Sequence, residues 1–462
     1  MELVKRIINA EPYKIKMVEP LRQITREERQ KLIAGAGYNV FNLSSEDVYI
    51  DLITDSGTSA MSQYQWAAML TGDEAYAGSK SYYHMRDTVR DITGYEYVLP
   101  THQGRGADHI FAELFIKPGS MIPGNMHFDT IRGHMAIKGG QPLDLVIDEG
   151  LQPESNHPFK GNLDPLKLEN VLKEHGHEKI PFILFTVTCN NNGGQPASME
   201  NIRTISEIAS KYRVPLFFDV ARFAENCFFI RERESGYREK AIVEIAREMF
   251  SYGDGCIMSA KKDGLVNIGG FMAMRDEALS RKASQQLIIY EGFPTYGGMS
   301  GRDMEALAVG LREVLELPYL QHRIGQVAQL GRNLVEEGVP IVEPAGGHAI
   351  YLDMKRFLPQ IPRDQFPGIS LCVALYVEAG VRAVELGTCA FGEKDPKTGE
   401  VLYPELELVR MTIPRRVYTN SHIEVVAKSV IDLYKNRKSL RGFKLIYEAP
   451  VLRHFTCRFE PL

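Results

Sequence analysis

A lysine pair and an aspartate each close a short apolar run of this sequence. Lys261 and Lys262 come directly after the run at residues 255–260, and Asp219 ends the run at residues 214–219. A lysine amine can form a Schiff base with an aldehyde, and a carboxylate can keep a ring nitrogen protonated. These two residue types are therefore what covalent chemistry on a carbonyl-bearing cofactor requires.

Residues that could bind a phosphate stand beside a further apolar run. Gln103, Gly104 and Arg105 follow the run at residues 95–100 and open a helix-like segment, and Ser259 precedes the lysine pair. Backbone N–H groups at a helix start bind phosphate, and a hydroxyl adds a donor. By itself this loop could equally be a plain turn, because it matches neither the GxxxxGK[ST] nor the GxGxxG pattern.

Pyridoxal phosphate requires all of these groups at one place. The set assigns Lys262 to the Schiff base, Asp219 to the pyridine nitrogen, and Arg222 with Asn190 to the phenolic oxygen. A substrate α-carboxylate calls for a bidentate arginine, for which Arg410 is the candidate. Each residue also has an ordinary alternative: Asp219 as a helix N-cap, the lysines as a solvated pair, and Arg410 as an exposed strand charge.

The elements that must position these residues alternate between strand-like and helix-like patterns. The runs at 182–189 and 214–219 are apolar and rich in β-formers, and apolar residues at helical spacing lie between them at 202–212. This βαβ unit predicts a parallel sheet, with residues 267–274 as the neighbour of the strand at 255–260. Ligands of such sheets bind beyond the carboxyl ends of the strands, where the polar residues stand.

The character of the sequence changes near residues 310–330, after a helix with one apolar face. Segments 341–354 and 406–413 alternate apolar and polar residues, as in a half-exposed antiparallel sheet. We therefore predict three parts: an arm at 1–50 that also joins the small domain, a large cofactor-binding domain at 51–315, and a small domain at 316–462.

Composition and charge exclude several classes of protein. The 462 residues carry 54 Lys and Arg against 59 Asp and Glu, which predicts no binding to nucleic acid. No stretch has the uncharged apolar length of a membrane helix, and the first residues do not resemble a signal peptide. The six cysteines form no CxxC pair, which argues against a disulfide framework or structural zinc and favours a cytoplasmic protein. We expect an enzyme with a small-molecule substrate.

Eight strings of the sequence, in the same order, resemble the β-eliminating lyases, and the resemblance runs from near residue 11 to the C-terminus. The strings are IDLITDSGT (50–58), GDEAYAGS (72–79), PTHQGRGA (100–107), GGQPASM (193–199), MSAKKD (258–263), EGFPTYGG (291–298), RMTIPRRVYT (410–419) and VLRHFT (451–456). The resemblance implies an α/β PLP-dependent transferase fold of the aspartate aminotransferase type (fold type I). Its large domain would hold a mainly parallel seven-stranded sheet beside a smaller α+β domain. It also implies pyridoxal 5'-phosphate, a potassium ion and a homotetramer.

The matched strings carry the family's cofactor roles onto residues of this chain. Lys262 resembles the Schiff-base lysine, and Asp219 and Arg222 resemble the partners of the pyridine nitrogen and the phenolic oxygen. Phe128 matches the residue stacked on the cofactor ring. The remaining residues expected at the cofactor are Gln103, Gly104, Arg105, Asn190, Ser259 and Lys261.

The resemblance also implies substrate and cation sites. Arg410 matches the residue for the substrate carboxylate, with Thr54 and Ser56 beside the substrate. Tyr76 matches a catalytic tyrosine that reaches the site of a neighbouring subunit. The expected cation ligands are Gly57, Glu74 and Asn267.

The family comprises tryptophanases and tyrosine phenol-lyases, and three pocket positions favour the tryptophan branch. Leu386 replaces an arginine of the tyrosine branch, Asp129 replaces a threonine, and His454-Phe455 replaces Phe-Phe. The main prediction is therefore β-elimination of L-tryptophan to indole, pyruvate and ammonium. Tyr76 is the candidate general acid, and Asp129 and His454 would orient the indole.

Other readings of the sequence stay open. The segment at 115–130 is compact and resembles the tyrosine branch in length, so the alternative is cleavage of L-tyrosine to phenol, pyruvate and ammonium. A different PLP activity, such as transamination or a cysteine-directed lyase, is a second rival. A catalytically inactive assembly protein is a third.

Overall fold

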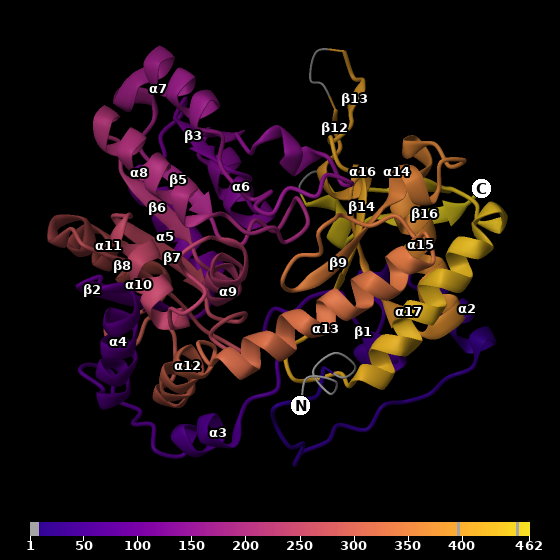
Figure 1. Cartoon of the computed structure of the whole chain (residues 1–462), viewed down its shortest axis with the longest axis horizontal. Helices are drawn as coiled ribbons and strands as arrows, with labels where there is room; N and C mark the ends of the chain where they lie inside the picture. Colours follow the sequence, from indigo (N-terminus) through magenta and orange to yellow (C-terminus); the bar gives the residue numbers. More distant parts are fainter. Residues whose placement is uncertain (1–8, 395–397, 450–451) are drawn as a thin grey trace.

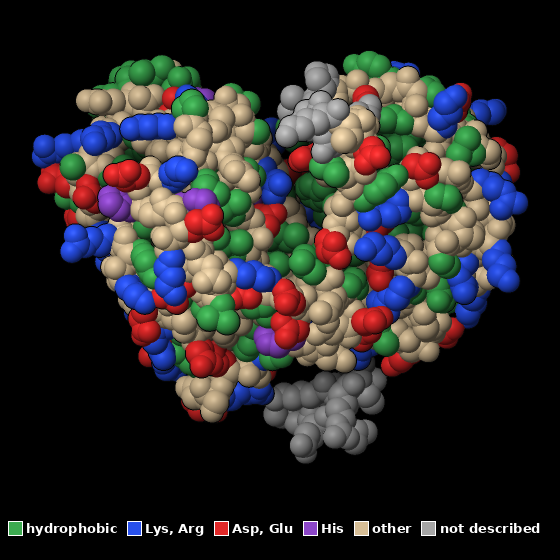
Figure 2. Space-filling view, turned by 90° about the horizontal axis from the view of Figure 1, so that it is seen from above, with side chains coloured by type: hydrophobic (Ala, Val, Ile, Leu, Met, Phe, Trp, Pro, Cys, Tyr) green, Lys and Arg blue, Asp and Glu red, His purple; other side chains and the backbone are tan. Residues whose placement is uncertain are grey.

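The chain forms two bodies joined by the long helix α13 (Leu317–Glu336) (Figure 1). This computed structural model describes residues 9–394, 398–449 and 452–462. The first eight residues of the predicted arm and Val451 of the string at 451–456 lie outside the described residues. Figure 2 shows a hollow between the two bodies.

The first body is built, within the described residues, on a seven-stranded sheet. In spatial order the strands are β2 (Tyr97–Thr101), β8 (Gly270–Met274), β7 (Gly255–Ser259), β6 (Leu216–Asp219), β5 (Ile183–Thr186), β3 (Met121–Gly124) and β4 (Gln141–Asp144). β8 runs antiparallel to both of its neighbours, and the pairs from β7 to β4 are all parallel. The predicted parallel sheet is thus confirmed, with the 267–274 segment beside the 255–260 strand.

Amphipathic helices cover this sheet. Helix α8 (Met199–Tyr212) shows why such a helix packs on the sheet. Its apolar residues at helical spacing form one buried face, made of Met199, Ile202, Ile205 and Ala209. The Ser198 side chain caps α8 by accepting a hydrogen bond from the Asn201 amide. The other helices of this body are α4 (Lys80–Thr93), α5 (Gly104–Phe115), α6 (Asp129–Ile137), α7 (Pro165–Lys179), α9 (Phe223–Arg233), α10 (Ile242–Ser251), α11 (Glu277–Tyr290) and α12 (Gly301–Glu313).

The second body holds an antiparallel sheet in the order β11 (Val384–Leu386), β14 (Leu408–Thr412) and β9 (Ala349–Asp353). The expectation of a half-exposed sheet is wrong, because every residue of β9 and β14 is buried. Helix α15 (Pro367–Ala379) packs on this sheet. Arg410 of β14 reaches Asn190 of the first body. Helices α2 (Arg26–Gly35) and α17 (Asn420–Lys435) complete the body.

Short elements complete the two bodies. The helices among them are α3 (Gln63–Met69), α14 (Met354–Phe357) and α16 (Thr388–Phe391). The paired short strands are β1 (Ile50–Asp51) with β10 (Val381–Arg382), β12 (Glu393–Lys394) with β13 (Val401–Leu402), and β15 (Phe443–Tyr447) with β16 (Arg458–Pro461). Within the described residues, we find no helix with the length and apolarity needed to span a bilayer.

Each body has its own hydrophobic core, and α13 contributes to both. Tyr319, Leu320 and Ile324 join the core of the first body, whereas Val327 and Leu330 join that of the second. Buried residues between 33 and 53 also pack in the second core. The domain boundaries expected from the sequence remain predictions.

Candidate active site

Lys262 lies in the turn that follows β7. Its Nζ donates a hydrogen bond to Ser259 Oγ at 2.9 Å and stands 5.9 Å from the centre of the Phe128 ring. Burial and the nearby Arg222 charge lower the pKa of Lys262 to about 8. A substantial share of this amine is therefore neutral near pH 8, which is the state that attacks a carbonyl group.

Asp219 closes β6, the strand next to β7, and pairs there with Ile257. Its carboxylate accepts a hydrogen bond from the Ala221 amide at 3.3 Å. Burial raises the pKa of Asp219, and the positive charge of Lys262 opposes that rise. A cationic partner would stabilise the ionised form of a carboxylate in this position, because burial reduces its solvation by water.

The start of α5 forms an anion cradle beside the lysines. A Cβ at Gly104 would lie 2.5 Å from Ser259 Cβ, so the two segments approach more closely than any other residue allows. Lys261 Nζ donates to Gln103 Oε1 at 3.1 Å, and burial together with the Arg105 charge lowers the pKa of Lys261. Helix-start amides, a hydroxyl and two cations thus meet at one place, as a phosphate dianion requires.

Arg222 forms a bidentate ion pair that sequence reasoning missed. Its Nε and Nη2 donate to the Asp55 carboxylate at 3.1 and 2.7 Å. Arg415 Nη1 donates to the same carboxylate at 2.7 Å. Although burial opposes its ionisation, Arg222 and Arg415 hold the pKa of Asp55 well below its usual range.

Arg415 extends this pair into a buried network. Its Nη2 donates to Glu225 at 3.0 Å and to Asp263, the neighbour of Lys262, at 2.9 Å. Arg323 of α13 also donates to Glu225. Asp55 and Arg415 both stand inside strings that resemble the family, yet neither was needed for the expected chemistry. The sequence signal for this network was the presence of charged residues, inside the matched strings, to which the expected chemistry gave no role.

Arg410 points from β14 of the second body toward the first. Its Nη1 donates to Asn190 Oδ1 and its Nη2 to the Ile53 carbonyl, both at 3.1 Å. Arg410 Nε is buried and has no hydrogen-bond partner. The expected substrate residues Thr54 and Ser56 lie one and three residues after Ile53 and are half-buried. A guanidinium with a free donor here suits a carboxylate ligand.

Leu386 lies on the same face of the sheet as Arg410. Leu386 pairs with Leu408 and Val384 pairs with Arg410 across antiparallel strands, so these four side chains share one face. Asp129 opens α6, and burial raises its pKa while the Arg410 charge lowers it. The sequence-predicted pocket residues Leu386 and Asp129 are thus both brought toward Arg410.

His454 is only 7% exposed. Its Nδ1 has no hydrogen-bond partner, and burial together with the charges of Arg410 and Arg453 lowers the pKa of His454 to about 4. The ring centroid of Phe455 lies 4.0 Å from that of His454. His454 is therefore a neutral, partly unsatisfied imidazole in an aromatic environment.

Tyr76 is not brought to Lys262 within one chain. Its side chain is 71% exposed and its ring contacts only Phe293 and Tyr296 among the aromatic residues of the described chain. Its predicted place in a neighbouring subunit's site remains a prediction.

Two of the three expected cation ligands meet. Asn267 Nδ2 donates to the Gly57 carbonyl at 3.0 Å. Glu74 instead accepts a hydrogen bond from the Gly301 amide at the start of α12, at 3.0 Å, and pairs with Arg302. The potassium site therefore remains a prediction.

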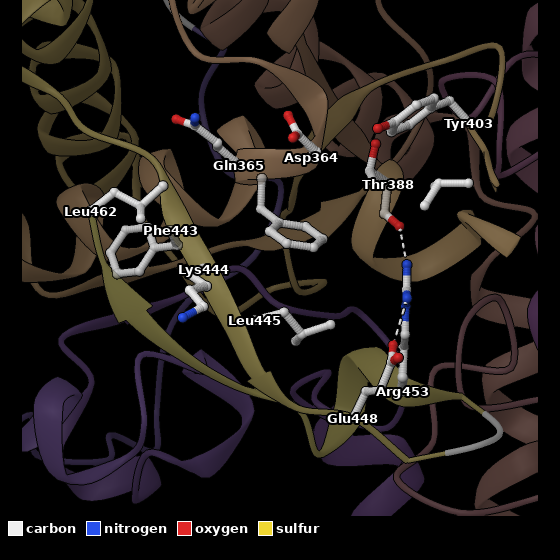
Figure 3. A pocket seen from close by; sticks show the side chains of 12 residues that line it. Asp364, Gln365, Thr388, Tyr403, Phe443, Lys444, Leu445, Glu448, Arg453 and Leu462 are labelled. Atoms are coloured by element: carbon white, nitrogen blue, oxygen red, sulfur yellow. Dashed lines mark hydrogen bonds and ion pairs between the residues drawn. The ribbon is translucent and has the colours of Figure 1, made fainter. Parts of the chain in front are cut away.

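A separate cavity of about 400 Å³ lies in the second body (Figure 3). Phe366, Phe443 and Leu445 line it, and none of the site residues expected from the sequence does. Arg453 borders the cavity and donates to the Thr388 carbonyl and to Glu448, both at 2.7 Å.

A half-buried lysine, a strand-end aspartate and a helix-start anion cradle on this sheet define a PLP-dependent enzyme of fold type I. Solved structures with the same fold include Leishmania major threonine aldolase, with a TM-score of 0.57 and 13% identity, covering 83% of this chain and 99% of that one. A SepCysS–SepCysE N-terminal domain complex also has this fold, with a TM-score of 0.55 and 12% identity, covering 85% of this chain and 96% of that one. The chain belongs to the β-eliminating lyase family, whose model matches residues 51–429.

Curated relatives resemble the chain along almost its whole length. Tyrosine phenol-lyase of Symbiobacterium sp. (strain SC-1) is 55% identical over 98% of this chain and 99% of the relative. The tyrosine phenol-lyases of Nostoc punctiforme and Clostridium tetani are 54% and 52% identical, over 98% of this chain and 96% and 98% of theirs. These relatives favour the tyrosine alternative over the tryptophan reading, which three pocket residues had favoured. The compact segment at 115–130 was the sequence feature that agreed with the tyrosine alternative.

The residues present fit pyridoxal phosphate, which the fold and family imply. Gly104 leaves no room for a side chain next to Ser259, so helix-start amides are open to a phosphate. Lys262 has the neutral amine needed for a Schiff base, and Asp219 is the half-buried carboxylate for a ring nitrogen.

Proposed function

We propose that this chain catalyses PLP-dependent β-elimination of L-tyrosine to phenol, pyruvate and ammonium. The observation that carries the proposal is the meeting of Lys262, Asp219 and the α5 cradle in a chain more than half identical to tyrosine phenol-lyases along its full length. When bound, the cofactor supplies an electron sink for the bond that breaks at the substrate Cα.

The residues of the chain have distinct roles in the proposed reaction. Lys262 Nζ accepts the Cα proton, because its lowered pKa makes the neutral amine available near pH 8. Arg410 binds the substrate carboxylate through its free Nε and orients the Cα–H bond toward Lys262. Because Arg410 belongs to the second body, substrate binding draws the two bodies together and excludes water.

L-Tryptophan is a second candidate substrate, because the leaving-group side of the site is apolar at Leu386. A leucine cannot hydrogen-bond a phenolic hydroxyl, but it can pack on an indole ring. A ring nitrogen of neutral His454 and the unpartnered Asp129 oxygen can each accept a hydrogen bond from the indole N–H.

Product release from the two amino acids decides between these substrates. Purified holoenzyme is assayed for phenol from L-tyrosine and for indole from L-tryptophan, and we expect phenol release to be faster. Leu386→Arg should raise the ratio of phenol to indole release, because its guanidinium can bond the phenolic oxygen, whereas Leu386→Met should change the ratio less. Faster indole release in the unaltered chain would favour the second candidate. Amino transfer to an oxo acid without pyruvate would overturn both.

The cation and the assembly are part of the same proposal. We propose that potassium binds near the Gly57 and Asn267 backbone and that Glu74 joins it in a homotetramer. Replacing potassium by sodium should lower activity, and Glu74→Gln should remove that dependence. Light scattering should give the mass of four chains, and a monomeric active enzyme would contradict the predicted role of Tyr76.

A further inference from the structure

Two buried cysteines face each other beside the leaving-group side of the site. Cys389 lies in α16, three residues after Leu386, and Cys457 lies three residues after His454. Their Sγ atoms are 3.6 Å apart, and both residues are free cysteines with 1% and 0% exposure. The contact therefore joins the segment that carries Leu386 to the segment that carries His454.

Hydrogen-bond donors surround this cysteine pair. Asn39 Nδ2 donates to the Cys457 carbonyl at 2.9 Å and lies 3.6 Å from Cys457 Sγ. Arg453 Nε donates to the Cys389 carbonyl at 2.9 Å. The hydrogen bond from Cys389 and the Arg453 charge both lower the pKa of the Cys457 thiol, despite its burial. An amide, a cation and a second thiol favour the thiolate, which is the reactive form.

A narrow cavity reaches Cys389. It measures about 10 Å³ and is lined by Cys389, His454, Phe41 and Glu385, among others. Cys457 does not line it, but Cys457 Sγ lies 3.6 Å from the Sγ of Cys389. This volume corresponds to about one water-sized molecule. The cavity therefore excludes a large thiol reagent, and entry of a molecule as small as hydrogen peroxide needs only a small displacement of the lining side chains.

We propose that Cys389 and Cys457 are a redox modification site that forms a reversible disulfide with a peroxide as oxidant. Cys457 Sγ attacks one peroxide oxygen, the O–O bond breaks, and a sulfenic acid and one water form. Cys389 Sγ then attacks the sulfenic sulfur, the S–O bond breaks, and a second water leaves with the remaining protons. Two thiols are oxidised and one peroxide is reduced to two waters, and a thiol reductant reverses the change.

The disulfide would alter the leaving-group side of the site. Sulfurs now 3.6 Å apart must approach by about 1.6 Å to reach bonding distance, which draws the His454 segment toward the Leu386 segment. This consequence rests on the proposed function. A substrate with a bulky aromatic leaving group should be affected more than β-chloro-L-alanine, whose chloride needs no aromatic pocket.

Peptide mass spectrometry of the oxidised holoenzyme tests the site. After treatment with hydrogen peroxide and blocking of free thiols, we expect a cross-linked peptide pair containing residues 389 and 457, lighter by two hydrogens and released by dithiothreitol. Cys389→Ala and Cys457→Ala should each abolish the pair, whereas Cys227→Ala, in the core of the first body, should retain it. Absence of the pair in the unaltered chain, or oxidation that stops at sulfinic acid, would overturn the proposal.

The covalent readout separates this proposal from the proposed function, because the cross-link forms whether phenol, indole or neither is released. In the activity arm, oxidation should raise KM for the aromatic substrate and dithiothreitol should restore it, with a smaller effect on β-chloro-L-alanine. If the disulfide forms and KM stays unchanged for both substrates, the proposed effect of the disulfide on the pocket is wrong.

Discussion

Burial shifts the acid–base properties of Lys262 and Asp219 in opposite directions. It lowers the pKa of the lysine and raises that of the aspartate, because in each case it disfavours the charged form. The negative charge of Asp219 partly offsets the fall in the pKa of Lys262, and the positive charge of Lys262 partly offsets the rise in the pKa of Asp219. The amine thus becomes reactive near pH 8, while the carboxylate gains from a cationic ligand.

The first prediction concerns the lysine pair. Lys262→Ala should abolish both the yellow colour of the holoenzyme and its β-elimination activity, because Schiff-base formation needs that amine. Lys261→Ala should keep the colour but weaken cofactor binding, because Lys261 only contributes charge to the cradle. Absorbance spectra during titration with pyridoxal phosphate measure both effects. A yellow Lys262→Ala protein would contradict the assignment.

A second prediction at this scale is the pH dependence of cofactor loading. The rate at which the apo-protein turns yellow with pyridoxal phosphate should rise with pH and level off above about 8, because only neutral Lys262 attacks the aldehyde. Stopped-flow absorbance at a series of pH values measures this rate. A rise that continues toward the usual lysine range near 10.5 would contradict the lowered pKa.

His454 makes a third prediction, about stability in acid. Its pKa is about 4 in the folded chain against 6.5 as the ordinary value, so the unfolded chain binds more protons between these values. The free energy of unfolding should therefore fall as the pH falls from 6.5 to 4. His454→Gln should reduce that fall, and His177→Gln, at an exposed site, should not. Urea unfolding across this pH range measures both, and identical slopes in all three proteins would refute the prediction.

At the scale of elements, the site depends on how closely α5 approaches β7. The parallel strands β6 and β7 bring Asp219 and Ser259 to the same edge of the sheet, with Asp219 opposite Ile257, two residues before Ser259. The helix start then comes within contact of Ser259 only because residue 104 has no side chain. Because α5 and β7 are so close here, adding one methyl group at residue 104 should disturb their packing.

Gly104→Ala should therefore both destabilise the chain and weaken cofactor binding. Its Cβ would lie 2.5 Å from Ser259 Cβ and 2.8 Å from Ser259 Cα, and relief of such overpacking costs about 1–3 kcal/mol. Gly35→Ala, in α2, is the control, because no heavy atom lies within 4 Å of its Cβ. That change should stabilise α2 by up to about 1 kcal/mol. Unfolding curves and cofactor titrations should separate the two variants.

At the scale of the whole molecule, the two bodies meet through buried charge. Arg415 and Arg323 belong to the second body and its connecting helix, whereas Glu225 and Asp263 belong to the first. Asp263 follows Lys262 directly, so this network ties the position of the catalytic lysine to the relative position of the bodies.

Arg415→Met should destabilise the chain strongly. Removing one partner from a buried ion network leaves unpaired charge and costs about 3–5 kcal/mol. Lys435→Met, which removes an exposed pair with Glu337, should cost about 0–1 kcal/mol. Urea unfolding of the apo-proteins compares them. Equal stability of the two variants would show that the network does not hold the bodies together.

Much of the fold could be predicted from local pattern. The apolar runs at 182–189 and 214–219 contain β5 and β6, and the helical spacing between them is α8. Burial of the second sheet could not be predicted, because alternation along β14 shows which residues share a face but not what covers it. Asp55 and Arg415 were missed for a similar reason, since their partners are distant in the sequence.

The sequence by itself determined the family, the βαβ order and the residue types of the site, because these depend on local pattern and on matched strings. Only the tertiary structure decided which groups meet. It brought Arg410 to Asn190, Arg222 to Asp55, and Cys389 to Cys457, and it left Glu74 at the start of α12. Contacts between segments so far apart in the chain arise from packing within and between the two bodies, which no local pattern encodes.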